Sequence, residues 1–100
     1  KDRGLIEATL ARLSEMVASR LREHKLHART VQLKLRYSDF STFTRAHTLE
    51  EPTQLDIVLI EESRKLFLDN WTGGAVRLLG VQASNLQAVE GQMSLLEQDK

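Results

Sequence analysis

The chain has 100 residues, of which 41% are hydrophobic and 28% are charged, and its formal net charge at pH 7 is zero. It contains no cysteine, which excludes disulfides and thiolate metal sites, and no apolar run approaches the roughly 20 residues of a membrane span. We therefore expect a single cytoplasmic domain that does not contact a membrane.

A helix is predicted from Leu5 to about His24, because apolar residues recur at helical spacing. The stripe consists of Ile6, Leu10, Leu13, Val17 and Leu21. The sequence EHKLHAR breaks this period and is expected to be a connector. A strand should follow from Arg29 to Tyr37, where apolar and polar residues alternate strictly.

The next segment is predicted to return as the second strand of a hairpin. The residues SDF favour a turn, and the strand should run from Thr42 to Leu49. Pro52 is expected to end it, because proline cannot donate to a sheet ladder. Thr53 is a candidate N-cap for a second helix that reaches about Trp71.

The sequence TGG stops this helix, and a last strand is predicted from Ala75 to Ser84. The sequence NLQAVEG is expected to leave the fold. The element order α-β-β-α-β predicts an α+β two-layer sandwich, in which an antiparallel sheet carries two helices on one face. The other sheet face is then open to solvent or to a partner.

Catalytic and metal-binding patterns are not evident. No glycine-rich phosphate loop occurs, and His24, His27 and His47 lack the spacing of metal ligands. The carboxylates of the second helix are predicted to lie on its solvated side. We expect no enzyme activity from this chain and no cofactor in it.

The open sheet face is the candidate binding surface. Gln32, Lys34 and Arg36 project from the first strand, beside Thr42 and Thr44 of the second. Such donors contact phosphates without reading sequence. Charge is uneven along the chain: residues 20–47 hold seven Lys/Arg and two acids, whereas residues 50–70 hold six acids and two Lys/Arg. The plain alternative is a solvated face with no ligand.

Two other kinds of module use similar architecture. An RNA-recognition sheet needs aromatic side chains on its open face, but Tyr37 and Phe43 have the parity of core residues. A protein-interaction domain would instead use the acidic second helix. Both alternatives remain open at this point.

Two motifs resemble a known family. The sequences VQLKLRYSDFSTFTRAHTL and VRLLGVQASNL, with a helix between them, are similar to the little finger domain of Y-family translesion DNA polymerases of the bacterial polymerase IV type. The resemblance spans the chain from the first helix to Leu86. It implies a β-α-β-β-α-β fold with sheet order 1-4-2-3, whose first edge strand is missing here.

The resemblance also implies a function. The domain would hold primer–template duplex DNA without sequence preference, while the catalytic carboxylates and Mg²⁺ would lie in the rest of the polymerase chain. Its parent would be a DNA-directed DNA polymerase that acts in lesion bypass. The DNA-binding residues would be Gln32, Lys34, Arg36, Thr42, Thr44, Arg45, His47, Thr48, Arg77, Gly80 and Gln82.

Two points depart from this expectation or stay open. Leu78 and Gln82 occupy positions on the last strand where some relatives carry arginine, which lowers the charge there. Alternation from Phe43 puts Arg45 and His47 on the helix side, unless a bulge after SDF reverses them.

The end of the chain resembles a bacterial sliding-clamp-binding peptide. This motif consists of Gln92, Met93, Ser94, Leu95 and Leu96. A flexible tail could present its glutamine and apolar pair to a preformed pocket on the clamp. We therefore divide the chain into a DNA-binding domain, residues 1–86, and a tail, residues 87–100.

Overall fold

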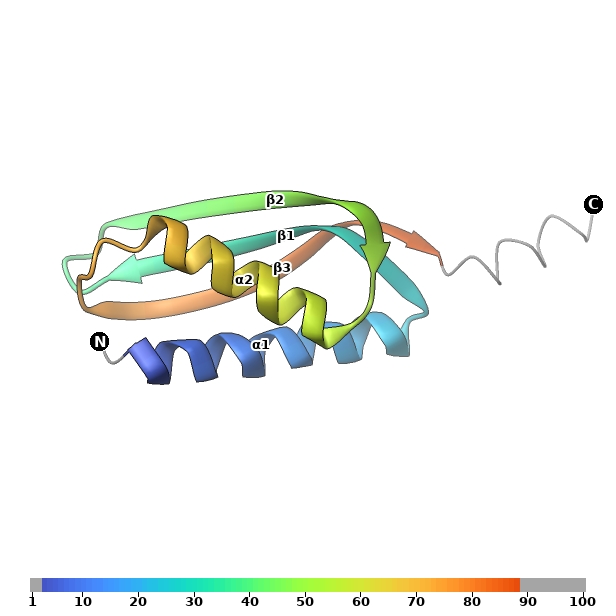
Figure 1. The fold of residues 1–100 in the computed structure, drawn as a ribbon, viewed down its shortest axis with the longest axis horizontal. Coiled ribbons are helices and arrows are strands. Elements are labelled where there is room, and N and C mark those ends of the chain that lie inside the picture. The colour runs from blue at the N-terminus through green and yellow to red at the C-terminus, as the bar shows by residue number, and fades with distance from the viewer. Residues whose placement is uncertain (1–2, 89–100) are drawn as a thin grey trace, which may run out of the picture.

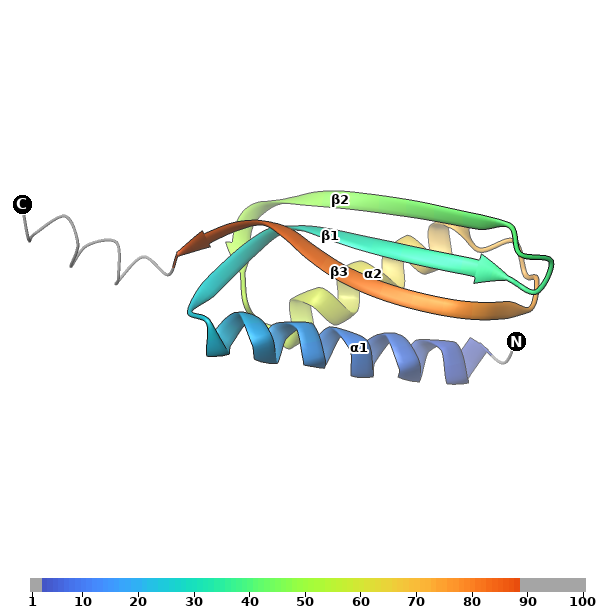
Figure 2. The ribbon, with the colours of Figure 1, turned by 180° about the vertical axis from the view of Figure 1, so that it is seen from behind.

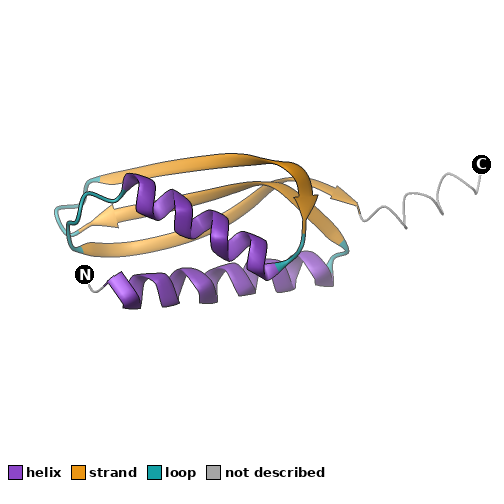
Figure 3. Cartoon of the chain, viewed as in Figure 1, coloured by secondary structure: helices purple, strands orange, loops and turns teal. Residues whose placement is uncertain are grey.

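A computed structural model describes residues 3–88 of the chain. The described residues form two helices and three strands in the predicted order, and Figures 1 and 3 show their arrangement. The elements are α1 (Arg3–Glu23), β1 (Leu26–Tyr37), β2 (Thr42–Thr53), α2 (Asp56–Asn70) and β3 (Val76–Ala88). Among the described residues, neither helix is long and apolar enough to cross a membrane.

The three strands form one antiparallel sheet in the order β2-β1-β3. Both helices pack on one face of it, α1 against β1 and β3 and α2 against β1 and β2. Seen from behind, in Figure 2, the strands lie in front of α2. The predicted α+β two-layer sandwich is confirmed, and the sheet order is the one expected for strands two to four of the little finger fold.

The core lies between the sheet and the two helices. Val31, Leu33 and Leu35 of β1 are fully buried. They meet Leu10 of α1 and Phe67 of α2, which are also fully buried, within one cluster. Burying such side chains stabilises the fold by about 1.5–3 kcal/mol each, so the central strand carries a large share of the stability.

The contact between the helices is built from small residues. Ser14 and Ala18 of α1 are fully buried, although the predicted stripe of α1 contained neither. The Oγ of Ser14 lies 3.1 Å from the Oγ of Ser63 on α2, and the Ser63 hydroxyl also donates to the carbonyl of Ile60. Small side chains let the helices approach closely, and the two hydroxyls satisfy each other in the core.

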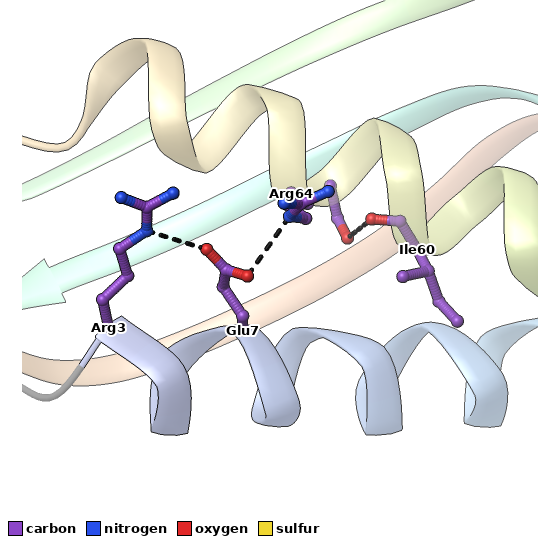
Figure 4. A network of polar contacts seen from close by, with 5 residues as sticks. Arg3, Glu7, Ile60 and Arg64 are labelled. Atoms are coloured by element: carbon purple, nitrogen blue, oxygen red, sulfur yellow. Dashed lines mark hydrogen bonds and ion pairs between the residues drawn. The ribbon is translucent and has the colours of Figure 1, made fainter.

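A carboxylate joins the two helices at the start of α1, as Figure 4 shows. Glu7 accepts a hydrogen bond from Nε of Arg3 at 2.9 Å and one from Nε of Arg64 on α2 at 3.2 Å. The hydrogen bond from Arg3, with the charges of both guanidinium groups, holds the pKa of Glu7 below its ordinary value of 4.5. Glu7 thus links the first turn of α1 to the middle of α2.

β1 and β3 are longer than the sequence predicts. β1 begins at Leu26 rather than Arg29, and β3 continues to Ala88 rather than ending at Ser84. The two extensions pair with each other, Leu26 with Ala88 and Ala28 with Leu86. Neither extension has a strong strand pattern in its own sequence, and each is held as a strand by pairing with the other. The prediction that NLQAVEG leaves the fold is therefore wrong for residues 85–88.

β2 also continues past the expected stop at Pro52, to Thr53. Between Thr48 and Thr53 the register with β1 shifts, which makes a bulge in the strand. Arg29 of β1 fills it by donating from Nε to the Leu49 carbonyl at 2.8 Å and from Nη2 to the Glu50 carbonyl at 3.0 Å. A proline is tolerated in such a bulge because the ladder is already interrupted there.

The predicted helix cap is also wrong. The N-cap of α2 is Leu55, and the Oγ1 of Thr53 accepts a hydrogen bond from the Leu55 amide at 3.1 Å. Thr53 therefore shapes the turn before the helix instead of capping it. At the other end, Trp71 is the C-cap and stacks on Phe67 with ring centroids 4.9 Å apart.

The outer edge of β3 pairs with no strand among residues 3–88. Two hollows lie along this edge, between β3 and α1. One is lined by side chains that include Val17, Leu21 and Ala83, and the other by side chains that include Leu13 and Val76. In the fold implied by the resemblance, this is the edge at which the first strand would pair.

The Glu7 contacts predict a dependence of stability on pH. Because the pKa of Glu7 is lowered by folding, its stabilising contribution is fully present above its ordinary value of 4.5 and is lost as pH falls through the lowered pKa. Glu7→Gln should therefore destabilise the chain at pH 7 and have a smaller effect at pH 3. Urea unfolding at both pH values measures the free energy of unfolding of the variant and of the unchanged chain. A difference between these free energies that is as large at pH 3 as at pH 7 would contradict the prediction.

Candidate nucleic-acid interface

The register of the sheet defines the face opposite the helices. From Thr30 to Arg36, β1 pairs without interruption with β2 on one side and with β3 on the other. Its side chains therefore alternate between the two faces of the sheet. The face without helices, hereafter the open face, carries Thr30, Gln32, Lys34 and Arg36 of β1, Thr42, Thr44, Ala46 and Thr48 of β2, and Leu78, Gly80, Gln82 and Ser84 of β3.

Cross-strand hydrogen bonds order the polar groups of the open face. Nε of Arg36 donates to the Oγ1 of Thr42 at 3.1 Å. Nε2 of Gln32 donates to Oε1 of Gln82 at 3.3 Å, and the hydroxyls of Thr30 and Thr48 lie 3.2 Å apart. The side chains are thus aligned across the three strands.

Lys34 and Arg36 give this face its charge. Lys34 lies on the central strand between Thr44 of β2 and Gly80 of β3. None of the open-face residues defined above is acidic, and neither cation has an ion pair among the described residues. A positive surface of this kind, with several hydroxyl groups, attracts an anion that runs along the sheet.

Arg45 and His47 lie on the opposite face. Nε of Arg45 donates to Oδ1 of Asn70 on α2 at 3.1 Å, and Nε2 of His47 lies 3.9 Å from Oε1 of Glu62 on α2. No bulge interrupts β2 between Thr42 and Thr48, so the alternation from Phe43 holds. The two residues predicted to bind DNA are therefore separated from the other candidates of β2.

Arg77 lies at the end of the sheet, next to an irregularity in the pairing of β1 with β3 between Arg36 and Tyr37. Its guanidinium carbon lies 4.4 Å from the ring centroid of Phe40, at the tip of the β1–β2 hairpin. Phe40 is not a binding residue that the sequence pattern predicts, because it lies in a turn, where the alternation of a strand cannot place its side chain.

Gly80 faces Lys34 across the sheet. A β-carbon at position 80 would meet the Cβ of Lys34 at 3.8 Å, which is ordinary contact. The glycine is therefore not required by the packing of the sheet. It instead leaves the space beside the lysine side chain open, which suits a surface that a bulky anion approaches.

Comparison with known proteins bears on the identity of this surface. The structure resembles a solved structure described as "Complex of beta-clamp processivity factor and little finger domain of PolIV", with a TM-score of 0.65 and 28% sequence identity, over 83% of this chain and 75% of that one. The sequence model of the impB/mucB/samB family C-terminal domain matches residues 1–95. The chain belongs to this family.

Several curated relatives are named DNA polymerase IV. The chain is 36% identical to the protein of Listeria monocytogenes serovar 1/2a over 89 residues, 42% identical to that of Streptomyces coelicolor over 85, and 38% identical to that of Streptococcus mutans over 97. These alignments cover 88%, 85% and 94% of this chain but only 25%, 18% and 26% of the relatives. The chain thus spans about a quarter of their length or less.

The predicted resemblance to a little finger domain of the polymerase IV type is confirmed by these matches. The predicted clamp-binding residues 92–96 lie outside the described residues. The boundary at residue 86 between domain and tail also stays a prediction.

Replacing Gly80 or Gly74 by alanine should change the stability of the chain in opposite directions. Gly80→Ala should stabilise the chain by about 0.5–1 kcal/mol, because alanine loses less backbone entropy in a strand and has room here. Gly74→Ala should destabilise it, since a β-carbon there would lie 3.2 Å from Cδ1 of Tyr37, and this ring is held in place by the hydrogen bond that its hydroxyl accepts from the Thr72 amide. Thermal unfolding of both variants measures this; a loss of stability in Gly80→Ala would show that the strand needs the glycine.

Proposed function

We propose that this chain is a duplex-DNA-binding accessory domain of a lesion-bypass DNA polymerase, and that its open face holds the sugar-phosphate backbone of primer–template DNA. The observation that carries the proposal is the open face itself. On this face Lys34 and Arg36 lie among hydroxyl groups, and none of the paired residues that make up the face is acidic. Both helices pack against the other face of the sheet, so neither covers the open face and a long polyanion can run across the strands.

The proposed contacts are to phosphates, which explains the residue types. The DNA-binding residues are Lys34 and Arg36, with Gln32, Thr42, Thr44, Thr48, Gly80 and Gln82 around them. Arg77 adds a cation at the end of this surface. Arg45 and His47 could reach DNA only around the outer edge of β2, because they face α2.

The parent protein would be a DNA-directed DNA polymerase of the bacterial cytoplasm. Its catalytic carboxylates and Mg²⁺ would belong to a part outside this chain, in line with the share of the relatives that the chain covers. The competing functions are an RNA-binding module and a protein-interaction domain. The open face carries no aromatic side chain in its paired rows, which favours backbone contact over base stacking on the sheet.

Removing the two cations of the open face should weaken duplex binding and reduce its dependence on salt. For Lys34→Ala with Arg36→Ala, we expect the negative slope of log K against log[salt] to become shallower by roughly 0.9 for each phosphate that the variant no longer neutralises. Fluorescence anisotropy with a blunt labelled duplex, over a range of salt concentrations, measures both the affinity and the slope.

The matched control is Arg12→Ala with Lys65→Ala, which removes the same charge from the helices. It should leave the slope nearly unchanged, because these residues lie on α1 and α2. Equal losses of affinity in the two double variants would assign binding to net charge rather than to the open face. Stronger binding to RNA than to duplex DNA would favour the alternative module.

We also propose that residues 92–96 dock on a bacterial sliding clamp. The support is the sequence QMSLL and the solved little finger domain to which this chain is similar, which is described in complex with a beta-clamp. A peptide of residues 88–100 should bind the clamp, and Gln92→Ala should remove that binding, whereas Gln98→Ala should not. Calorimetry decides this; equal binding by all three peptides would exclude the motif.

A further inference from the structure

We propose that the tip of the β1–β2 hairpin holds an unpaired nucleobase, in a single-stranded segment next to the bound duplex, by stacking it on Phe40. This inference rests on the proposed function, because it extends the same DNA-binding surface at one end. It assigns to the domain a preference for junctions between duplex and single-stranded DNA.

The first observation is an exposed aromatic ring on a strained backbone. Phe40 is 61% exposed, and its φ of 71° lies in the left-handed region that a bulky side chain seldom adopts. A conformation of this kind persists only where the surroundings fix it, and it is concentrated at functional sites. Burial in the core does not account for this ring.

Hydrogen bonds hold the turn that carries the ring. The amide of Phe40 donates to the Tyr37 carbonyl at 2.9 Å, and the amide of Tyr37 donates to the Ser41 carbonyl at 2.9 Å. The Asp39 carboxylate accepts from the Ser41 amide at 2.9 Å and from its hydroxyl at 2.6 Å. These bonds from the Ser41 hydroxyl and amide keep the pKa of Asp39 below its ordinary value. The ring is therefore presented by a preorganised turn.

The second observation is the position of the ring. The ring meets the guanidinium of Arg77 on β3. The Phe40 carbonyl accepts a hydrogen bond from the Thr42 hydroxyl at 3.5 Å, and Arg36 donates to the same hydroxyl on the open face.

The pair formed by Phe40 and Arg77 suits a nucleotide. The guanidinium lies 4.4 Å from the ring centroid, within cation–π range, and both side chains are exposed. A base offers a flat face to the ring, and its phosphate offers a negative charge to the guanidinium. Stacking on aromatic side chains beside a basic groove is how proteins hold single strands. Bases inside a duplex are already stacked on both sides, so the partner must be an unpaired base.

The test compares a blunt duplex with the same duplex carrying a short single-stranded overhang, bound to the 100-residue chain. We expect the overhang to be bound more tightly, and Phe40→Asn to reduce that binding by about tenfold. Affinity for the blunt duplex should change less than twofold. Asparagine tolerates the left-handed backbone, so this variant removes the ring and keeps the turn.

Two further measurements make the result specific. An overhang with abasic sites should lower the affinity of the unchanged chain by a similar factor, and Phe40→Trp should keep the preference. Ile57→Asn on α2 is the matched control, because Ile57 is also an exposed apolar residue, at 56%. It should change neither affinity, and thermal unfolding verifies that all variants are folded.

Three outcomes would overturn the inference: an unchanged affinity of Phe40→Asn for the overhang, an equal loss for both DNAs, or a loss of sliding-clamp binding with DNA binding intact. The last would assign the tip to a protein contact. If the unchanged chain binds neither DNA, the proposed function itself fails. If it binds both and Phe40→Asn alters neither, only the stacking inference fails.

Discussion

The unbroken antiparallel register of β1 with both of its neighbours is the constraint on which the rest of the structure depends. Between Thr30 and Arg36, each residue of β1 is paired on both sides. Because strand side chains alternate, this register fixes two surfaces at once: one carries Val31, Leu33 and Leu35 against the helices, and the other presents Lys34 and Arg36. A slip of one residue would bury the cations and expose the core, so burial and binding specify the same register.

The register breaks at both ends of this segment, and the two breaks differ. Near Ala28, β2 bulges out and Arg29 satisfies two of its carbonyls from the central strand. The guanidinium of Arg29 therefore has a structural role, because it is hydrogen-bonded to the backbone of β2. Near Tyr37, the shift lies beside the hairpin tip, where Arg77 stacks on Phe40 and both stay exposed. A cation and a ring at this end remain available to a ligand.

The sequence predicted the middle of each element better than its ends. Strict alternation and helical spacing identify β1, α1 and α2 because a packed face must repeat with the period of the backbone. The ends of β1 and β3 depend on their mutual pairing, and the passage of β2 beyond Pro52 depends on a bulge. Ser14 was missed because a polar residue is buried only when a partner such as Ser63 faces it.

The sequence by itself determined the α+β order, the resemblance to the little finger domain and the open-face positions of β1, because these follow from local periodicity and from motifs that lie together in the chain. Only the tertiary structure decided that Arg45 and His47 face Asn70 and Glu62 of α2, and that Arg77 meets Phe40. These partners are far apart in the chain, so their contacts exist only after the sheet has paired and the helices have packed on it.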